Sequence, residues 1–313
     1  MNRKLITYAS LLIIVVFIGY IVYDSIKPSA PATEKTTSSY EERDIEDAWK
    51  IDAVIHVNQD KLTSVAASPD GSFYAAGNSF VSCYSDTSKI RWTYKSENPV
   101  TAIAVHSDTV YAATVNQILV INDGKLLNEW GPYENNSIIT SVSAGSDRIA
   151  LCDAGNRRVY IIDKGGEVLS IVGQKEPQFV LPSAYFDVAI STDNTFWVAN
   201  TGYRRIERRS NDGNVEGYFG EAGLAPEAFC GCCNPAHFTL IPGGFITAEK
   251  GINRIKILDD QGKFVEYVSS HNDFTPSVPL DIASADGQTI YAANPADSKI
   301  YIFKRKQETE SIK

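Results

Sequence analysis

The chain has 313 residues, of which 43% are hydrophobic and 21% charged, a composition typical of globular proteins. Its formal net charge of −9 argues against a nucleic-acid partner, since phosphate binding needs clustered Lys and Arg. The five cysteines are too few for a disulfide scaffold, and their odd number leaves at least one thiol unpaired within the chain.

The N-terminus has the pattern of a membrane anchor. Arg3 and Lys4 precede the uncharged stretch 5–23. A helix of this length reaches roughly 28 Å at about 1.5 Å per residue, close to the hydrocarbon thickness of about 30 Å. We therefore expect a transmembrane signal-anchor helix over 5–23, the alternative being a cleaved signal peptide, whose apolar region is usually only about 7–15 residues. Basic residues before the span predict a single-pass protein with residues 1–4 in the cytoplasm and the remainder extracytoplasmic, either periplasmic or extracellular.

After this stretch the composition changes twice. Residues 24–48 are rich in Pro, Ser, Thr and charge, without apolar periodicity, and are expected to form a flexible linker. The folded domain is expected over 49–306, followed by a C-terminal tail over 307–313.

A repeated strand pattern runs through the folded domain. Each copy is a short apolar strand, a polar turn and a second strand that ends in a small or polar residue. The second-strand copies are 73–77, 110–114, 149–153, 196–200, 245–249 and 290–294, and their last positions lie 37 to 49 residues apart. Six copies at this spacing are typical of propeller blades.

The remaining strands complete the blades. A third strand follows each copy, at 81–84, 118–121, 159–162, 206–209, 255–258 and 300–303. Fourth strands follow at 168–172, 215–219 and 264–268, whereas the sixth copy has none. The strand at 51–57 can fill that place and close the ring, which removes exposed sheet edges. The predicted fold is therefore all-β: a six-bladed β-propeller with four-stranded blades, closed by its N-terminal strand and preceded by one transmembrane helix.

Two segments resemble the NHL repeat, whose core reads roughly VADxGNxRIxVFD. They are DAGNRRVYIID at 153–163 and NTGYRRI at 200–206, and the pairs Val172-Gly173 and Phe219-Gly220 resemble the FG that closes an NHL blade. The resemblance covers about residues 50–306 and implies a six-bladed propeller. It implies little about function, because NHL propellers include binding scaffolds and some enzymes.

Propeller connectivity predicts which loops share a face. Strands alternate in direction, so the connections between strands 2 and 3 and those from strand 4 to the next strand 1 share one face, here named the loop face. It carries the long loops 174–184, 221–236 and 269–279. Irregular loops on a rigid scaffold commonly carry function, so we expect a protein or small-molecule ligand to bind there.

The segment FCGCCNPAH, at 229–237, lies in one of these loops. It holds three of the five cysteines and one of the four histidines: Cys230, Cys232, Cys233 and His237. Thiolates and imidazole ligate zinc, copper and iron–sulfur clusters, so one hypothesis is a transition-metal or iron–sulfur cofactor on these four residues. The spacing is not the usual CxxC of zinc sites. A structural disulfide, a redox-active dithiol and a contact with a partner protein therefore remain alternatives.

Four cations precede third strands in successive blades and are expected to form an arc on the loop face: Arg158, Arg205, Arg254 and Lys299. They would bind an anionic ligand or, alternatively, pair with acidic residues such as Asp153 or Glu249. Asn200 and Glu249 end second strands and complete the expected ligand-binding face. Cys83 and Cys152 lie within strands and are expected to pack in the core.

Three functions follow from these features. The first is a membrane-anchored, extracytoplasmic NHL-type binding module. The second is a metal or redox protein that uses the cysteine segment. The third is a propeller hydrolase or lyase, because Asp153, Asn200, Glu249 and Asn294 hold equivalent blade positions and would converge at the mouth of the ring. No complete catalytic motif is present, which favours a binding function over an enzyme.

Overall fold

The computed structural model describes residues 8, 11–19, 45–175, 177–270, 273–275 and 277–307. The chain divides into two units, Met1–Asp44 and Ile45–Lys313. In the first unit, residues 8 and 11–19 are helical. No helix in the described part of the chain combines the length and apolar character needed to cross a bilayer. The rest of the predicted span 5–23, residues 1–4, most of the linker and the tail after 307 lie outside the described residues.

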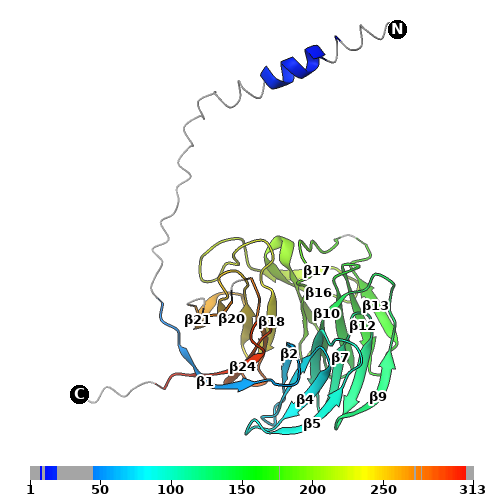
Figure 1. Ribbon diagram of the computed structural model, residues 1–313, viewed down its shortest axis with the longest axis vertical. Helices are drawn as coiled ribbons and strands as arrows, with labels where there is room; N and C mark the ends of the chain where they lie inside the picture. The colour runs from blue at the N-terminus through cyan, green and yellow to red at the C-terminus, as the bar shows by residue number, and fades with distance from the viewer. Residues whose placement is uncertain are drawn as a thin grey trace, which may run out of the picture. The chain divides into compact units, whose positions relative to one another are not determined.

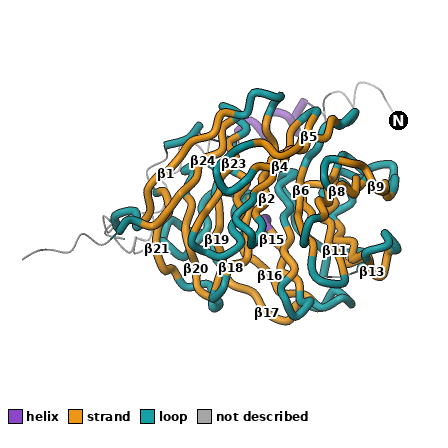
Figure 2. The backbone as a smooth tube through the Cα atoms, turned by 90° about the horizontal axis from the view of Figure 1, so that it is seen from below, coloured by secondary structure: helices purple, strands orange, loops and turns teal. Residues whose placement is uncertain are grey.

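The second unit folds into six antiparallel sheets of four strands each (Figures 1 and 2). The innermost strands are β2 (Leu62–Ala67), β6 (Ala102–His106), β10 (Ile139–Ala144), β14 (Val188–Ile190), β18 (His237–Ile241) and β22 (Asp281–Ala283). The second strands are β3 (Phe73–Gly77), β7 (Thr109–Ala113), β11 (Arg148–Asp153), β15 (Phe196–Asn200), β19 (Gly244–Ala248) and β23 (Thr289–Asn294).

The outer half of each blade follows the same order. Third strands are β4 (Phe80–Tyr84), β8 (Ile118–Asn122), β12 (Arg158–Asp163), β16 (Arg205–Arg209), β20 (Ile255–Asp259) and β24 (Lys299–Arg305). Fourth strands are β5 (Ile90–Lys95), β9 (Lys125–Trp130), β13 (Val168–Val172), β17 (Val215–Phe219), β21 (Phe264–Ser269) and, in the sixth blade, β1 (Trp49–His56). A short 3-10 helix, η1 (Thr201–Tyr203), connects β15 to β16. The six-bladed, all-β prediction is confirmed.

The N-terminal strand closes the ring. β1 pairs antiparallel with β24 from Trp49 opposite Arg305 to His56 opposite Lys299, and the two lie side by side in Figure 1. Trp49 is buried and donates its indole N–H to Glu266 Oε1 at 2.8 Å. The predicted closing strand is confirmed and begins two residues earlier than 51, because burial of this indole extends the pairing.

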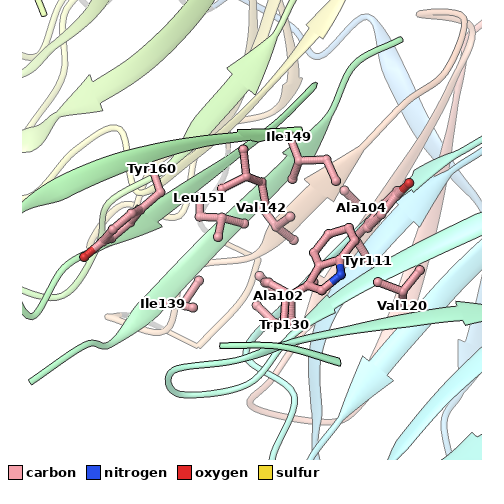
Figure 3. Packing of buried hydrophobic residues seen from close by; sticks show 13 residues of the cluster. Ala102, Ala104, Tyr111, Val120, Trp130, Ile139, Val142, Ile149, Leu151 and Tyr160 are labelled. Atoms are coloured by element: carbon pink, nitrogen blue, oxygen red, sulfur yellow. The ribbon is translucent and has the colours of Figure 1, made fainter. Parts of the chain in front are cut away.

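The core is divided among the six blade interfaces. Six clusters of buried apolar residues are found in the described part, and each joins two neighbouring blades. Figure 3 shows the cluster between the second and third blades, where Tyr111 stacks on Trp130 with ring centroids 5.8 Å apart. Cys83 and Cys152 are buried in two other clusters, so their predicted packing role is confirmed. Burial of these side chains, at about 1.5–3 kcal/mol each, stabilises the ring.

A glycine directly follows the fourth strand in the third and fourth blades, because a larger residue would not fit there. Gly173 and Gly220 have φ of +94° and +96°. A Cβ at Gly173 would lie 2.8 Å from the Arg157 carbonyl oxygen, and one at Gly220 would lie 2.9 Å from that of Arg204. Only glycine fits this turn, which sends the chain from the circumference into the long connections of the loop face.

Candidate functional site

The innermost strands surround a polar cavity at the centre of the ring. Its volume is about 160 Å³, and residues from all six blades line it. Asp187, His237 and Asp281 line it from three successive blades. They lie at the start of β18 and β22 and just before β14, which is the end of the cavity that opens to the loop face.

Polar side chains at this end link each blade to the next. Asp281 Oδ2 accepts hydrogen bonds from the Ser64 hydroxyl at 2.6 Å and the Val65 amide at 2.8 Å, which joins the sixth blade to the first. Ser64 Oγ in turn accepts the Ile103 amide, and the Ser141 hydroxyl donates to Asp187. Asp187 Oδ2 also accepts the Phe238 amide at 2.7 Å. The cavity end is therefore preorganised by the fold.

His237 sits between two carboxylates in this ring. Its Nδ1 lies 3.7 Å from Asp187 Oδ2 and 3.5 Å from Asp281 Oδ1, and its side chain is 22% exposed. Burial opposes the charged form, but the neighbouring carboxylates of Asp187 and Asp281 raise the pKa of His237 above 6.5. Burial raises the pKa of Asp281, against the opposing influence of His237 and Ser64. The two carboxylates therefore favour the protonated form of His237.

An aromatic ring and an ammonium group extend the mouth of the cavity. The ring of Tyr185 lies edge-on to His237, with centroids 6.4 Å apart, and Lys250 Nζ lies 4.5 Å from the centroid of Tyr185. The backbone amide of Lys250 donates to Asn234 Oδ1 at 2.9 Å. The cavity mouth and the cysteine segment are thus connected through Lys250.

The cysteine segment is clamped at both ends. The Cys230 amide donates to Glu249 Oε2 at 2.9 Å, and Asn234 Nδ2 donates to the carbonyls of Cys230 at 2.7 Å and Lys250 at 3.0 Å. Between the clamps, Cys232 is exposed and Cys233 is buried, and their sulfurs lie 3.1 Å apart. All five cysteines of the chain are free.

The expected four-ligand metal site is not assembled. Cys230 Sγ faces Asn234 and the Lys250 carbonyl, the sulfurs of Cys232 and Cys233 face each other, and His237 faces Asp187 and Asp281. In the described part of the chain, no group of three or more His, Cys, Asp or Glu side chains is arranged to hold a metal ion. The physical reason is that these side chains have separate hydrogen-bonding partners, so they do not converge on one point.

The predicted cationic arc is neutralised by acids of the protein. Arg158 pairs with Glu134, Arg205 with Glu207 at 2.6 Å, Arg254 with Glu249 at 2.7 Å, and Lys299 with Asp297 at 3.4 Å. The interpretation as paired cations is therefore right, with Glu249 as one predicted partner. Asp153 is instead occupied by the Ser137 hydroxyl and the Ile138 amide. An open collar for an anionic ligand is not formed by these four residues.

The polar residues at or next to the ends of second strands bind backbone amides of the loop face. Asp153 accepts the Ile138 amide, Asn200 Oδ1 accepts the Val180 amide, and Glu249 accepts the Cys230 amide. Each bond fixes the connection that enters the innermost strand of the same blade. All three side chains are buried.

Two buried charge clusters extend beyond the ion pairs expected from the sequence. Glu207 pairs with Arg205 and Arg209 in the fourth blade, whereas in the fifth blade Lys256 pairs with Glu249 at 3.1 Å and donates to the Ala228 carbonyl. Burial lowers the pKa of Lys256 to about 8, although Glu249 opposes the shift. Asn200 and Glu207 in one blade correspond in position to Glu249 and Lys256 in the next. The two blades therefore carry polar side chains at the same two positions, but with different charges.

The exposed large apolar side chains of the described propeller fall into two groups. One group lies on fourth strands at the circumference: Ile51, Val54, Ile90, Leu126, Leu127, Val168, Leu169, Tyr218 and Val265. The other, here named the apolar arc, lies in connections of the loop face: Val115, Ile138, Val180, Tyr203 and Leu224. The backbone bonds Ile139 to Val115 and Gly202 to Val180, both 2.8 Å, place these connections beside one another. The apolar arc spans connections of the second to fifth blades.

Comparison with known proteins identifies the fold and no closer relationship. No protein-family model matches the chain, so the NHL resemblance is not confirmed by this comparison, and no curated protein matches either. A Bacteroides thetaiotaomicron protein of unknown function superimposes with a TM-score of 0.64 at 16% identity, covering 81% of this chain and 72% of that one. A streptogramin B lyase gives 0.59 at 14% identity, covering 83% and 100% of the two chains. The WD40 propeller domain of Doa1 gives 0.58 at 11%, covering 83% and 98%.

Asp187 and Asp281 are site residues that the sequence reasoning missed. A signal was available, because Asp187, His237 and Asp281 occupy the same place at the start of innermost-strand copies four to six. An alignment of the first strands places all three at one position. At these identities the solved structures show the propeller fold alone.

Proposed function

We propose that this propeller is a non-catalytic, NHL-type binding module that holds a protein partner on its loop face. The single observation that carries the proposal is the apolar arc. Outside the strands, the exposed large apolar residues of the described propeller all lie in connections of this one face. Exposed apolar groups gathered on one face and surrounded by polar residues are typical of protein-interaction surfaces.

The cavity mouth supplies the polar part of this surface. Asp187 and Asp281 flank His237 beside the aromatic ring of Tyr185, and the cavity behind them is about 160 Å³. His237 lies between the two carboxylates and Lys250 covers the ring of Tyr185, so the mouth offers polar contacts to a partner. In this proposal the partner makes polar contacts at the mouth and packs apolar side chains on the arc.

Site-specific photocrosslinking in the native organism tests the proposal. A photoreactive residue at Leu224, on the loop face, is compared with one at Leu127, on the circumference; the two side chains are 76% and 64% exposed. We expect one discrete adduct from position 224 that is absent from position 127. A second variant, Val180→Asp, should weaken the adduct, whereas Val168→Asp should not. Equal adducts from both positions, or adducts only from position 127, contradict a partner on the loop face.

An N-terminal anchor belongs to the same proposal. A helix over 5–23 holds the propeller at a membrane, outside the cytoplasm, and the residues between this helix and Ile45 form the tether. The support is the uncharged stretch itself and the basic residues Arg3 and Lys4 that precede it. Protease added to intact cells or spheroplasts should digest the tether and release the propeller. Protection of the propeller until the cytoplasmic membrane is opened contradicts this orientation.

A further inference from the structure

The adjacent cysteines of the loop face form a second feature that partner binding does not explain. Cys232 Sγ and Cys233 Sγ lie 3.1 Å apart, so little movement separates them from a covalent bond. Cys232 is exposed, and Cys233 is buried behind it. An accessible sulfur in contact with a protected one is the arrangement of an attacking and a resolving cysteine.

The surroundings hold this pair in place and keep the third cysteine away. The Cys230 amide and carbonyl are bound by Glu249 and Asn234, and its sulfur lies 3.5 Å from Asn234 Nδ2. The Gly231 carbonyl accepts Arg204 Nε at 2.7 Å. Hydrogen bonds therefore fix the backbone next to Cys232. Cys230 is held by its own contacts with Glu249 and Asn234, away from the pair.

Nearby polar groups favour the thiolate of the inner cysteine. Burial opposes ionisation, but the neighbouring Ser183 hydroxyl, the Cys232 thiol and the Lys250 ammonium lower the pKa of Cys233 below 9. Hydrogen bonding to Cys233 is the main cause that raises the pKa of Cys232, followed by the charge of Cys233. Of the two thiols, Cys233 is therefore the one whose ionisation is favoured.

We propose that Cys232 and Cys233 are a thiol–disulfide exchange site that forms a reversible disulfide between adjacent residues. Cys232, after losing its proton to water, attacks one sulfur of a small disulfide R–S–S–R′, whose S–S bond breaks to release R′–S⁻. The thiolate of Cys233 then attacks Cys232 Sγ and releases R–S⁻. The two cysteines lose two electrons and two protons in total, and the small disulfide gains them as two thiols.

The covalent geometry makes this bond reversible. Consecutive Cα atoms are about 3.80 Å apart across a trans peptide, below the usual Cα separation of about 4.4–6.8 Å in disulfides. A disulfide forced into this separation is strained and easily reduced. Exposed, strained disulfides are the labile and regulatory ones, whereas structural disulfides resist reduction. The site is therefore an exchange site rather than a structural link, and it does not depend on the partner proposed above.

The test uses the purified full-length chain in glutathione buffers of different reduced-to-oxidised ratios. Samples are quenched with acid, alkylated and mapped by mass spectrometry. We expect the loss of two alkylatable thiols, at Cys232 and Cys233, in a fraction that follows the buffer ratio. Cys233→Ser should accumulate a glutathione adduct on Cys232, and Cys232→Ser should lose both the adduct and the internal disulfide. Cys230→Ser is the matched control and should behave as the unaltered chain does.

Three results overturn the proposal. The first is that both thiols stay alkylatable at every ratio. The second is that the bond persists in excess reduced glutathione, which indicates a structural disulfide. The third is that Cys230→Ser abolishes the bond, which makes Cys230 the partner. If Cys233→Ser does not fold, as judged by circular dichroism, Cys233→Ala serves for the same trapping measurement.

Discussion

The Ser64 hydroxyl donates to Asp281 Oδ2 at 2.6 Å, although 217 residues separate them in the sequence. The same oxygen accepts the Val65 amide at 2.8 Å. These bonds join the sixth blade to the first at the centre of the ring. At the circumference, the N-terminal strand β1 pairs with β24 and completes the sixth blade. The ring is therefore closed twice: by the Ser64 and Val65 bonds to Asp281 near the axis (the inner closure) and by β1 at the circumference (the outer closure). The inner closure also orients Asp281 toward His237.

The inner closure predicts a measurable loss of stability in Ser64→Ala. The substitution removes a hydrogen bond to a carboxylate and leaves the Ile103 amide without its acceptor. We expect the free energy of unfolding to fall by about 1.5–3 kcal/mol, measured by urea denaturation. Thr87→Ala, in an exposed turn between β4 and β5, is the control and should change it by less than about 0.5 kcal/mol. An effect of Ser64→Ala as small as the control's contradicts an energetic role for the inner closure.

The outer closure predicts a larger loss in Trp49→Ala. The indole is 2% exposed and donates to Glu266, so its removal leaves a cavity and an unsatisfied acceptor. We expect a loss of about 3–5 kcal/mol in thermal or urea unfolding. Ile51→Ala on the same strand is the matched control, because Ile51 is 45% exposed and little apolar contact is lost. Similar losses in both variants indicate that strand pairing, rather than the indole, stabilises the closure.

The buried acid of the fifth blade predicts a third result. Glu249→Gln removes the charge that balances Arg254 and Lys256 inside the protein. Breaking a buried pair in this way is expected to cost roughly 3–5 kcal/mol. The control is Glu216→Gln, which removes an exposed pair with Arg208 and should cost about 0–1 kcal/mol. Equal stability of the two variants contradicts the structural role assigned to Glu249.

The pair of carboxylates around His237 predicts a pH dependence of stability. Because the pKa of His237 is raised in the folded state, the folded protein binds this proton more tightly than the unfolded chain does. Its contribution to stability is complete below the unfolded pKa of about 6.5 and is lost as pH rises through the folded pKa. His237→Gln should abolish this decrease in urea unfolding measured across that window.

A second histidine provides the control for that measurement. Burial and the charge of Lys164 lower the pKa of His106, so its contribution to stability has the opposite sign and increases with pH. His106→Gln should therefore steepen the decrease that His237→Gln abolishes. A pH profile that is unchanged by His237→Gln rules out the proposed stabilisation of the imidazolium by Asp187 and Asp281.

The blades could be predicted from the sequence because their causes are local. Alternating apolar residues and turn residues recur in each copy, as at Phe73–Gly77 and Phe196–Asn200, and these strands form as expected. The closing strand could be predicted because the sixth copy lacked a fourth strand. These inferences need only the period of a strand and the pairing of its edges.

The site was harder to predict because its contacts join distant segments. The sequence pattern predicts strand ends at Asn200 and Glu249; the structure ends these strands at Asn200 and Ala248, and both side chains turn inward to fix the preceding connection. The sequence does not show that inward direction. Cys230, Cys232 and Cys233 were recognised as unusual, yet their partners Asn234, Glu249 and Lys250 come from the fold.

The most direct test of the loop-face account is hydrogen–deuterium exchange of the full-length protein with and without its crosslink-identified partner. The account predicts slower exchange in the connections that carry the apolar arc, at 114–117, 131–138, 177–187, 201–204 and 220–236, with unchanged exchange in the turns at 85–89, 123–124 and 164–167 on the opposite face. Protection confined to the opposite-face turns or to the fourth strands at the circumference contradicts it.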